Sequence, residues 1–179
     1  MALPATIHTF DVQLADVDRG VYEDVALRVA RHPSETDANM LMRLLAYCLE
    51  YEEGIAFSEG ISSTDEPAVL VRDLTGSITA WIEVGAPDAE RLHRGSRLAD
   101  RTVVYTQREP ARLLASWAGK RIHRADELVV HSFDAGFVEG AVAAIERRNS
   151  MTVSVTERQL YLDLNGTALG TEVHEHRLP

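Results

Sequence analysis

The sequence contains few of the residues on which several common kinds of site depend. Of its 179 residues, one is a cysteine and one is a lysine. The single cysteine, Cys48, excludes an internal disulfide and leaves no cysteine-based metal cluster. No apolar run is long enough to span a membrane, and the N-terminus lacks the basic and apolar segments of a signal peptide. We therefore expect a cytoplasmic protein that does not associate with membranes.

Three catalytic or binding motifs are also missing: a serine nucleophile elbow, a glycine-rich phosphate loop and a CxxC pair. The net charge of −10 argues against a protein that coats nucleic acid without specificity. The charge is uneven, however. Residues 91–124 contain eight arginines and Lys120 against one aspartate and one glutamate, a local net charge of +7. Such a stretch indicates either an anion-binding face or an ordinary solvated surface.

Hydrophobic periodicity predicts an α/β protein with a mixed sheet and flanking helices. The N-terminal segments 6–14 and 22–30 alternate as a long β-hairpin, and Ser34 is the expected N-cap of a helix that ends near Glu53. The later elements are expected as a hairpin at 65–85, a helix from Asp88 to Arg101, a strand at 102–106, a helix at 110–119, a strand at 128–133, a helix at 134–148, a hairpin at 151–164 and a last strand at 169–174. Strands joined by helices imply partly parallel pairing in one domain over residues 1–179.

The central hairpin, residues 65–85, is expected to bring the candidate acids together. With a turn at Thr75-Gly76, residue numbers that face each other sum to about 151, so Glu83 lies opposite Ala68. Asp65 and Glu66 then lie beside Glu83 at the open end of the hairpin. Alternation predicts two faces for the second strand. Ile78, Ala80, Ile82 and Val84 point to the core, and Thr79, Trp81 and Glu83 point to a cleft or to solvent.

The helix that follows this hairpin carries an arginine face. One side of this helix has little side-chain bulk, which suits close packing on a sheet. It carries Leu92, Gly95 and Ala99. The other side carries four arginines within an arc of about 120°. These are Arg91, Arg94, Arg97 and Arg101. Acids at a strand end suit Mg²⁺ or Mn²⁺, and arginines nearby would clamp a phosphate bidentately. Glu35, from the residues alone, is an acid favoured by the dipole of a helix N-terminus.

The sequence also resembles the YaeQ family of bacterial proteins. The resemblance covers essentially the whole chain and rests on the motifs Arg31-His32-Pro33-Ser34-Glu35-Thr36, Asp65-Glu66-Pro67, Trp81-Ile82-Glu83-Val84-Gly85 and Pro87-Asp88 with Arg91. The fold of that family is a variant of the PD-(D/E)XK nuclease fold. The resemblance thus implies a restriction-endonuclease-like core of helix, three strands, helix and strand, with extra β-hairpins at both ends.

In nucleases of this fold, acids on the second and third core strands, and often a glutamate on the first helix, bind the metal. The resemblance places Asp65 or Glu66, Glu83 and Glu35 in those positions. The expected lysine is absent from the triplet Glu83-Val84-Gly85. In some relatives of the fold that lysine lies on the next helix, where this chain offers Arg94 or Arg91. Arginine does not deprotonate, so it would hold phosphate rather than act as a base.

Two hypotheses follow. The first is a Mg²⁺- or Mn²⁺-dependent nuclease or phosphodiesterase. Its expected catalytic residues are Glu83, Asp65, Glu35 and Arg94, its metal ligands Glu83 with Asp65 or Glu66, and its phosphate-binding residues Arg91, Arg94 and Arg97. The second is a non-catalytic module that binds nucleic acid or a protein partner. For His174 and His176, which share one face of a strand, a surface pair is favoured over a zinc site.

Overall fold

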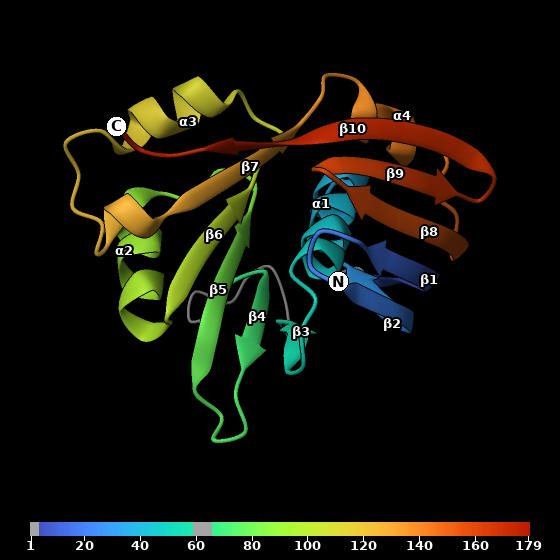
Figure 1. Cartoon of the computed structure of the whole chain (residues 1–179), viewed down its shortest axis with the longest axis horizontal. Coiled ribbons are helices and arrows are strands. Elements are labelled where there is room, and N and C mark those ends of the chain that lie inside the picture. Colours follow the sequence, from blue (N-terminus) through green and yellow to red (C-terminus); the bar gives the residue numbers. More distant parts are fainter. Residues whose placement is uncertain (1–3, 59–65) are drawn as a thin grey trace. The chain divides into compact units, whose positions relative to one another are not determined.

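The computed structural model describes residues 4–58 and 66–179, and the chain divides into two compact units (Figure 1). Unit 1 comprises residues 1–41 and 133–174, and unit 2 comprises residues 42–132 and 175–179. The predicted α/β class, with mixed strand pairing and flanking helices, is confirmed. One continuous domain over residues 1–179 remains a prediction.

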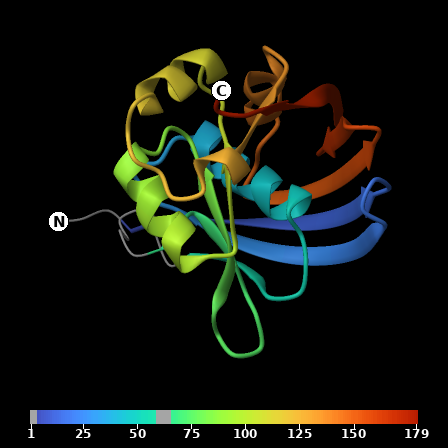
Figure 2. The same ribbon diagram turned by 60° about the vertical axis from the view of Figure 1, so that its left-hand side comes forward.

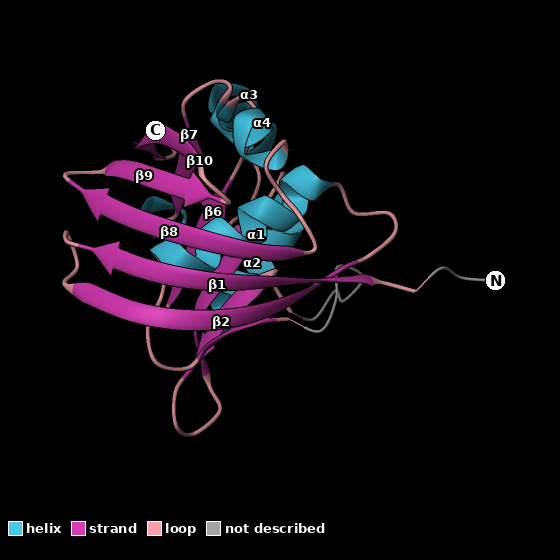
Figure 3. Cartoon of the chain, turned by 90° about the vertical axis from the view of Figure 1, so that its right-hand side faces the viewer, coloured by secondary structure: helices cyan, strands magenta, loops and turns pink. Residues whose placement is uncertain are grey.

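Unit 1 is built on long strands. They are β1 (Thr6–Asp16), β2 (Val21–Arg31), β8 (Arg148–Thr156), β9 (Gln159–Leu164) and β10 (Thr167–His176). Their order is β2-β1-β8-β9-β10, and Figure 3 shows the first four side by side. Strand β1 runs parallel to β8, and the other neighbours are antiparallel. Both predicted terminal hairpins, β1–β2 and β8–β9, are therefore confirmed.

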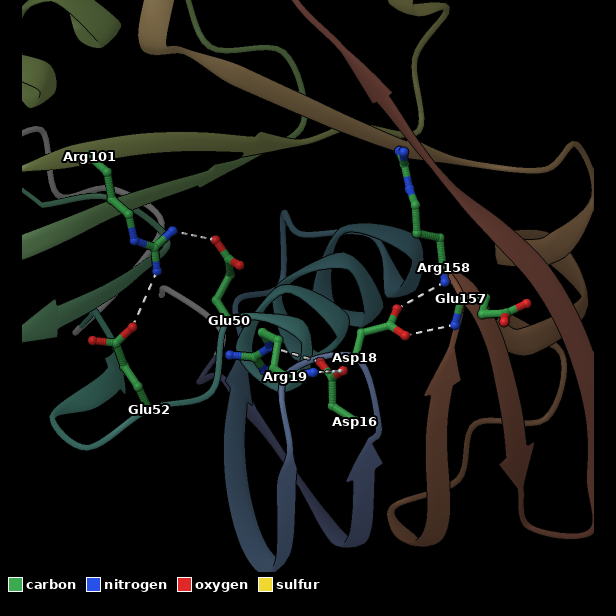
Figure 4. A network of polar contacts seen from close by, with 8 residues as sticks. All are labelled: Asp16, Asp18, Arg19, Glu50, Glu52, Arg101, Glu157 and Arg158. Atoms are coloured by element: carbon green, nitrogen blue, oxygen red, sulfur yellow. Dashed lines mark hydrogen bonds and ion pairs between the residues drawn. The ribbon is translucent and has the colours of Figure 1, made fainter.

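The turns of these two hairpins are joined by one carboxylate. Asp18 accepts hydrogen bonds from the backbone N–H groups of Glu157 and Arg158, at 2.7 and 2.9 Å (Figure 4). Both donors have positive φ angles, 51° and 65°, which is the geometry of a tight hairpin turn. Asp18 thus satisfies two N–H groups of a turn that is far away in the sequence.

Helix α1 (Asp37–Leu49) is shorter than predicted at both ends. The hydroxyl of Thr36 accepts the N–H of Asn39 at 3.0 Å, so Thr36 rather than Ser34 caps the helix. Ser34 instead hydrogen-bonds His32, through its N–H and through its hydroxyl, and stays in the preceding loop. Apolar residues of α1, Cys48 among them, are buried. Burial raises the pKa of the Cys48 thiol to about 12, which makes it inert.

The prediction of a long helix at residues 134–148 is wrong. Only α4 (Phe137–Val142) is helical, and Arg148 already begins β8. Asp134 does not cap the helix, because its carboxylate accepts the N–H of Glu172 and contacts His174. Within residues 4–58 and 66–179, no helix is both long and apolar enough to cross a membrane.

Unit 2 combines antiparallel and parallel strands. They are β3 (Ile55–Phe57), β4 (Val69–Arg72), β5 (Ile78–Val84), β6 (Arg101–Tyr105) and β7 (Val129–Phe133). The order is β7-β6-β5-β4-β3, with β5, β6 and β7 parallel and β3, β4 and β5 antiparallel. The connecting helices are α2 (Ala89–Leu98), α3 (Pro110–Trp117) and the short 3-10 helix η1 (Ala125–Glu127).

The register predicted for the central hairpin is confirmed along its body. Val69 pairs with Ile82 and Val71 with Ala80, and both pairs sum to 151. A bulge after Val71 shifts the pairing by one residue, so Ile78 faces Arg72 rather than Asp73. Asp73 is taken into the turn, where its carboxylate accepts the N–H groups of Thr75 and Ser77.

Strand β5 is buried on both faces, which corrects the expected orientation of Trp81 and Glu83 toward a cleft or solvent. Trp81 is fully buried and Glu83 is 4% exposed. Helix α2 covers this side of the sheet (Figure 2). The close approach depends on Gly95, because a Cβ atom there would lie 2.5 Å from the Trp81 ring.

Helices α2 and α3 share one apolar cluster with the parallel strands. Its buried members are Ala89, Leu92, Val104, Leu113, Trp117, Leu128 and Val130. The indole N–H of Trp117 also donates to the carbonyl oxygen of Pro87 at 2.9 Å. This bond ties α3 to the connection between β5 and α2, and it fixes the segment that leads from Glu83 to the arginines.

We predict that Gly95→Ala destabilises the protein. Alanine in place of glycine inside a helix normally stabilises it by about 1 kcal/mol. Here the added methyl group overlaps the Trp81 ring, so we expect a net loss of about 1–3 kcal/mol in the free energy of unfolding. Urea denaturation followed by circular dichroism measures this change. Arg94→Ala, at an exposed position of the same helix, is the matched control, and equal stability of both variants with the native chain contradicts the prediction.

Candidate functional site

The site of interest lies where β5 leads into α2. Glu83 stands near the end of β5, and Gly85 follows with φ = +88°. Asp88 caps α2 by accepting the N–H of Arg91 at 2.8 Å, which places Arg91 in the first turn of the helix. The bend at Gly85 and the cap at Asp88 therefore turn the chain so that the Arg91 side chain returns to Glu83.

Glu83 forms a closed set of polar contacts in the interior of unit 2. The Nε–H of Arg91 lies 2.9 Å from both carboxylate oxygens. The indole N–H of Trp81 donates to Oε1, also at 2.9 Å. Because Trp81 and Glu83 are two residues apart on one strand, their side chains lie on the same face, and the indole reaches the carboxylate directly.

Opposing influences act on the pKa of Glu83. Burial is the largest cause, and it raises the pKa of this carboxyl above its usual value. The Arg91 guanidinium and the Trp81 hydrogen bond lower it, and the charge of Asp88 raises it slightly. The net direction is upward. A raised pKa in the folded state means that this group favours folding most at low pH and loses that contribution as the pH rises through its folded-state pKa.

Arg91 also joins Glu66 to this set. Its Nη2 donates to the backbone carbonyl oxygen of Glu66 at 2.6 Å, while the Glu66 carboxylate pairs with Arg72 at 3.0 Å. Glu66 and Glu83, which the hairpin register predicts as neighbours, are thus brought together through the arginine. Asp65, the other candidate ligand, lies outside the described residues.

Glu35 is buried at 5% exposure and precedes α1 in unit 1. Asn39 donates a side-chain hydrogen bond to its carboxylate, and Arg31 donates to its backbone carbonyl at 2.9 Å. The predicted convergence of Glu35 with Glu83 stays a prediction, because the two residues belong to different units.

The four arginines expected on one helix face have different positions. Arg91 turns inward to Glu83, while Arg94 and Arg97 are exposed. Within the described part of the chain, neither Arg94 nor Arg97 has a carboxylate partner. Arg101 is not on the helix at all. It begins β6 and pairs with Glu50 at 2.7 Å and Glu52 at 3.4 Å (Figure 4).

One group in unit 1 has the composition of a metal site: Asp134, Glu172 and His174, whose ligand atoms lie within 4.8 Å of one another. Internal contacts account for the geometry. His174 Nε2 lies 2.6 Å from Asp134 Oδ1, and the backbone N–H of Glu172 donates to the other oxygen of Asp134. His176 contacts the hydroxyl of Ser132 instead.

The role of Trp81 and the inward turn of Arg91 were missed from the sequence. A signal existed for the tryptophan, because alternation already places Trp81 and Glu83 in one row. No comparable signal marks Arg91, since the rotation of a helix about its axis is set by packing. Here that packing is the contact of Gly95 with Trp81.

We predict that Arg91→Met leaves the buried Glu83 without its main counter-charge. Removing one partner of a buried ion pair typically lowers the free energy of unfolding by about 3–5 kcal/mol. The loss is expected to become smaller as the pH is lowered, because protonation of Glu83 removes the charge that Arg91 offsets, and larger as the pH is raised. Guanidinium denaturation at several pH values measures it. In a Glu83→Gln background, Arg91→Met is expected to show a smaller loss that does not depend on Glu83 ionisation. Equal losses in both backgrounds contradict the pairing.

Comparisons with known proteins agree on one family. The family model described as YaeQ protein matches residues 1–173. The uncharacterized protein YaeQ of Salmonella typhi is 41% identical over 105 residues, which cover 59% of this chain and 58% of that protein. YaeQ of Escherichia coli (strain K12) is 40% identical over 106 residues, which cover 59% of each chain. The matched segments thus span less than two thirds of these curated relatives.

Solved structures match over nearly the whole length. The crystal structure of the YaeQ protein from Pseudomonas syringae gives a TM-score of 0.87 at 31% identity and covers 97% of both chains. YaeQ from Xanthomonas axonopodis pv. citri also gives 0.87, at 29% identity, and covers 98% of this chain and 99% of that one. With the family model matching almost every residue, the chain belongs to the YaeQ family.

Proposed function

We propose that this chain is a non-catalytic, nucleic-acid-binding module with a PD-(D/E)XK nuclease-like core. One observation carries the proposal: both oxygens of Glu83, the central acid of the expected metal site, face the Nε–H of Arg91 at 2.9 Å. A guanidinium therefore provides the positive charge that a divalent cation would bring. The described residues do not fit Mg²⁺ or Mn²⁺ at Glu83 unless Arg91 moves away.

The order of elements supports a nuclease-like core. The resemblance implies helix, three strands, helix and strand, and the chain runs α1, β3, β4, β5, α2, β6 in that order. The backbone at the position of the missing lysine supports the loss of catalysis. Gly85 has φ = +88°, in the left-handed region that a lysine would enter only with strain. A simple Gly85→Lys reversion would thus not restore the triplet.

The exposed arginines of α2 support binding to a polyanion. Arg94 and Arg97 lie one turn apart on the helix and are free of carboxylate partners among the described residues. They belong to the stretch 91–124, which carries +7 in a chain whose total is −10. Because the rest of the chain is acidic, a polyanion is attracted to this region alone. This is consistent with a local contact rather than with coating of nucleic acid.

Metal-dependent hydrolysis of phosphodiesters is the second candidate. It is favoured by the burial of Glu83 and Glu35, because buried carboxyl groups with raised pKa values, such as Glu83, are typical of catalytic sites. In that case Mg²⁺ or Mn²⁺ would be held by Glu83 with Asp65 or Glu66, and Arg94 would hold phosphate. The two candidates differ in whether the acids are required, because hydrolysis needs Glu83 and its metal whereas binding alone does not.

We predict that the native chain binds single-stranded and duplex DNA without divalent metal and does not cleave either. Binding, measured by fluorescence anisotropy, is expected to weaken steadily as salt is raised, because phosphate contacts release counterions. Cleavage assays with Mg²⁺ and Mn²⁺ are run beside Glu83→Ala, Glu83→Gln and Asp65→Ala. Metal-dependent cleavage that these substitutions abolish would establish the hydrolase instead. Cleavage that survives all of them indicates a contaminant, and failure to bind any nucleic acid points to a protein partner.

A further inference from the structure

Beside the second half of α2, four basic side chains come together. They are His93, Arg97, Arg121 and His123, here called the basic cluster. We infer that the basic cluster is a binding site for the phosphodiester backbone of a nucleic acid. This assignment rests on the proposed function, and it gives that function a specific place on unit 2.

Arg124 fixes the segment that carries half of the cluster. Its guanidinium donates to three carbonyl oxygens at or just beyond the end of α2, those of Ser96, Ala99 and Asp100. These carbonyls otherwise lack partners within the helix, and a cation is favoured at this end of the helix dipole. Arg124 itself has φ = 51°, so the chain bends sharply there. The preceding residues, Arg121 and His123, are therefore held alongside α2.

A direct contact then joins the two histidines. The backbone N–H of His123 donates to Nδ1 of His93 at 3.0 Å, and the two ring centroids are 6.5 Å apart. Because Nδ1 accepts this bond, the neutral His93 ring carries its hydrogen on Nε2, where it can serve as a donor. The bond thus fixes both the orientation and the tautomer of His93.

Among the described residues, no acid compensates the charges of the two arginines in the basic cluster. Arg97 and Arg121 are exposed, and within the described ranges neither has a carboxylate within ion-pair distance. Arginines elsewhere have such partners: Arg19 pairs at 2.8 Å, Arg72 at 3.0 Å and Arg101 at 2.7 Å. Burial is the first cause that lowers the pKa of His93, and the charges of the rest of the cluster lower it further. A bound anion would relieve this mutual repulsion.

Phosphate is the anion whose chemistry fits best. Guanidinium groups bind its oxygens in a bidentate manner, and an imidazole N–H adds a further donor. Arg94 lies three residues before Arg97 on the same helix, so a second phosphate of a chain would meet another exposed cation. This extension favours a polymeric ligand over a single phosphate ion.

The small depression next to the cluster shares His123 with it but has a different character. It is lined by acids as well as bases, including Asp100, Arg101, Arg124 and Glu127. Its arginines already bind Glu50, Glu52 or helix carbonyls. The phosphate contact is therefore assigned to the protruding side chains of the basic cluster and not to the depression.

Charge-removing variants test this site. Arg97→Gln and Arg121→Gln are each expected to weaken binding of fluorescein-labelled single-stranded DNA about tenfold, the effect of losing one charge-assisted hydrogen-bonded contact. Each is also expected to reduce the slope of log K against log salt by about 0.7. Arg28→Gln removes the same charge from an exposed position on β2, and we expect it to leave binding within about twofold. Circular dichroism confirms that each variant is folded.

A histidine titration gives an independent measurement. In NMR spectra of the full chain, saturating single-stranded DNA is expected to raise the pKa of His93, because bound phosphate reverses the sign of the local field. Normal DNA binding by both arginine variants, or a pKa of His93 that DNA leaves unchanged, overturns the site while the proposed function stands. If no nucleic acid binds, the proposed function and the assignment of the site to a nucleic acid both fail. A shift of the His93 pKa by inorganic pyrophosphate would then show a site for small phosphate anions only.

Discussion

The contact between Arg91 and Glu83 is the constraint on which unit 2 depends. A carboxylate that is 4% exposed is tolerated only when its charge and lone pairs are satisfied. Arg91 and Trp81 satisfy them, and Arg91 reaches on to the carbonyl oxygen of Glu66. One guanidinium therefore connects the end of β5, the first turn of α2 and the segment before β4. Loss of this cation would disturb three parts of the unit together.

The same contact explains why the sheet is covered so closely. With its N–H bound to Glu83, the Trp81 ring lies so close to α2 that a side chain at position 95 would overlap it. Trp117 then holds the carbonyl oxygen of Pro87 and fixes the connection from the other side. Polar and apolar contacts thus specify one rotation of α2, which turns Arg91 inward and leaves Arg94 and Arg97 outside.

Local patterns in the sequence predict what is decided locally. Turn chemistry at Thr75-Gly76 gave the register of β4 and β5, and it failed only at the bulge after Val71. The failure at Ser34 is local, because that residue bonds His32, but other features have distant causes. Asp134 is drawn away from its helix by His174, about forty residues later, and β1 finds its parallel partner β8 across most of the chain. Among the candidate site residues, the acids were identifiable by residue type. The inward turn of Arg91 depends on how α2 packs on the sheet, which the spacing of hydrophobic residues does not reveal.

In the proposed module, a guanidinium takes the place of a metal ion, which changes what the site can do. A divalent cation exchanges, activates water and carries two charges, whereas arginine keeps its proton and offers only directed hydrogen bonds. With Glu83 paired in this way, its buried charge is offset by a side chain of the protein itself. The remaining cations of α2 are then available to the exterior. In the proposed binding module, attraction of a phosphate chain would survive this exchange, whereas the activation of water that hydrolysis needs would not.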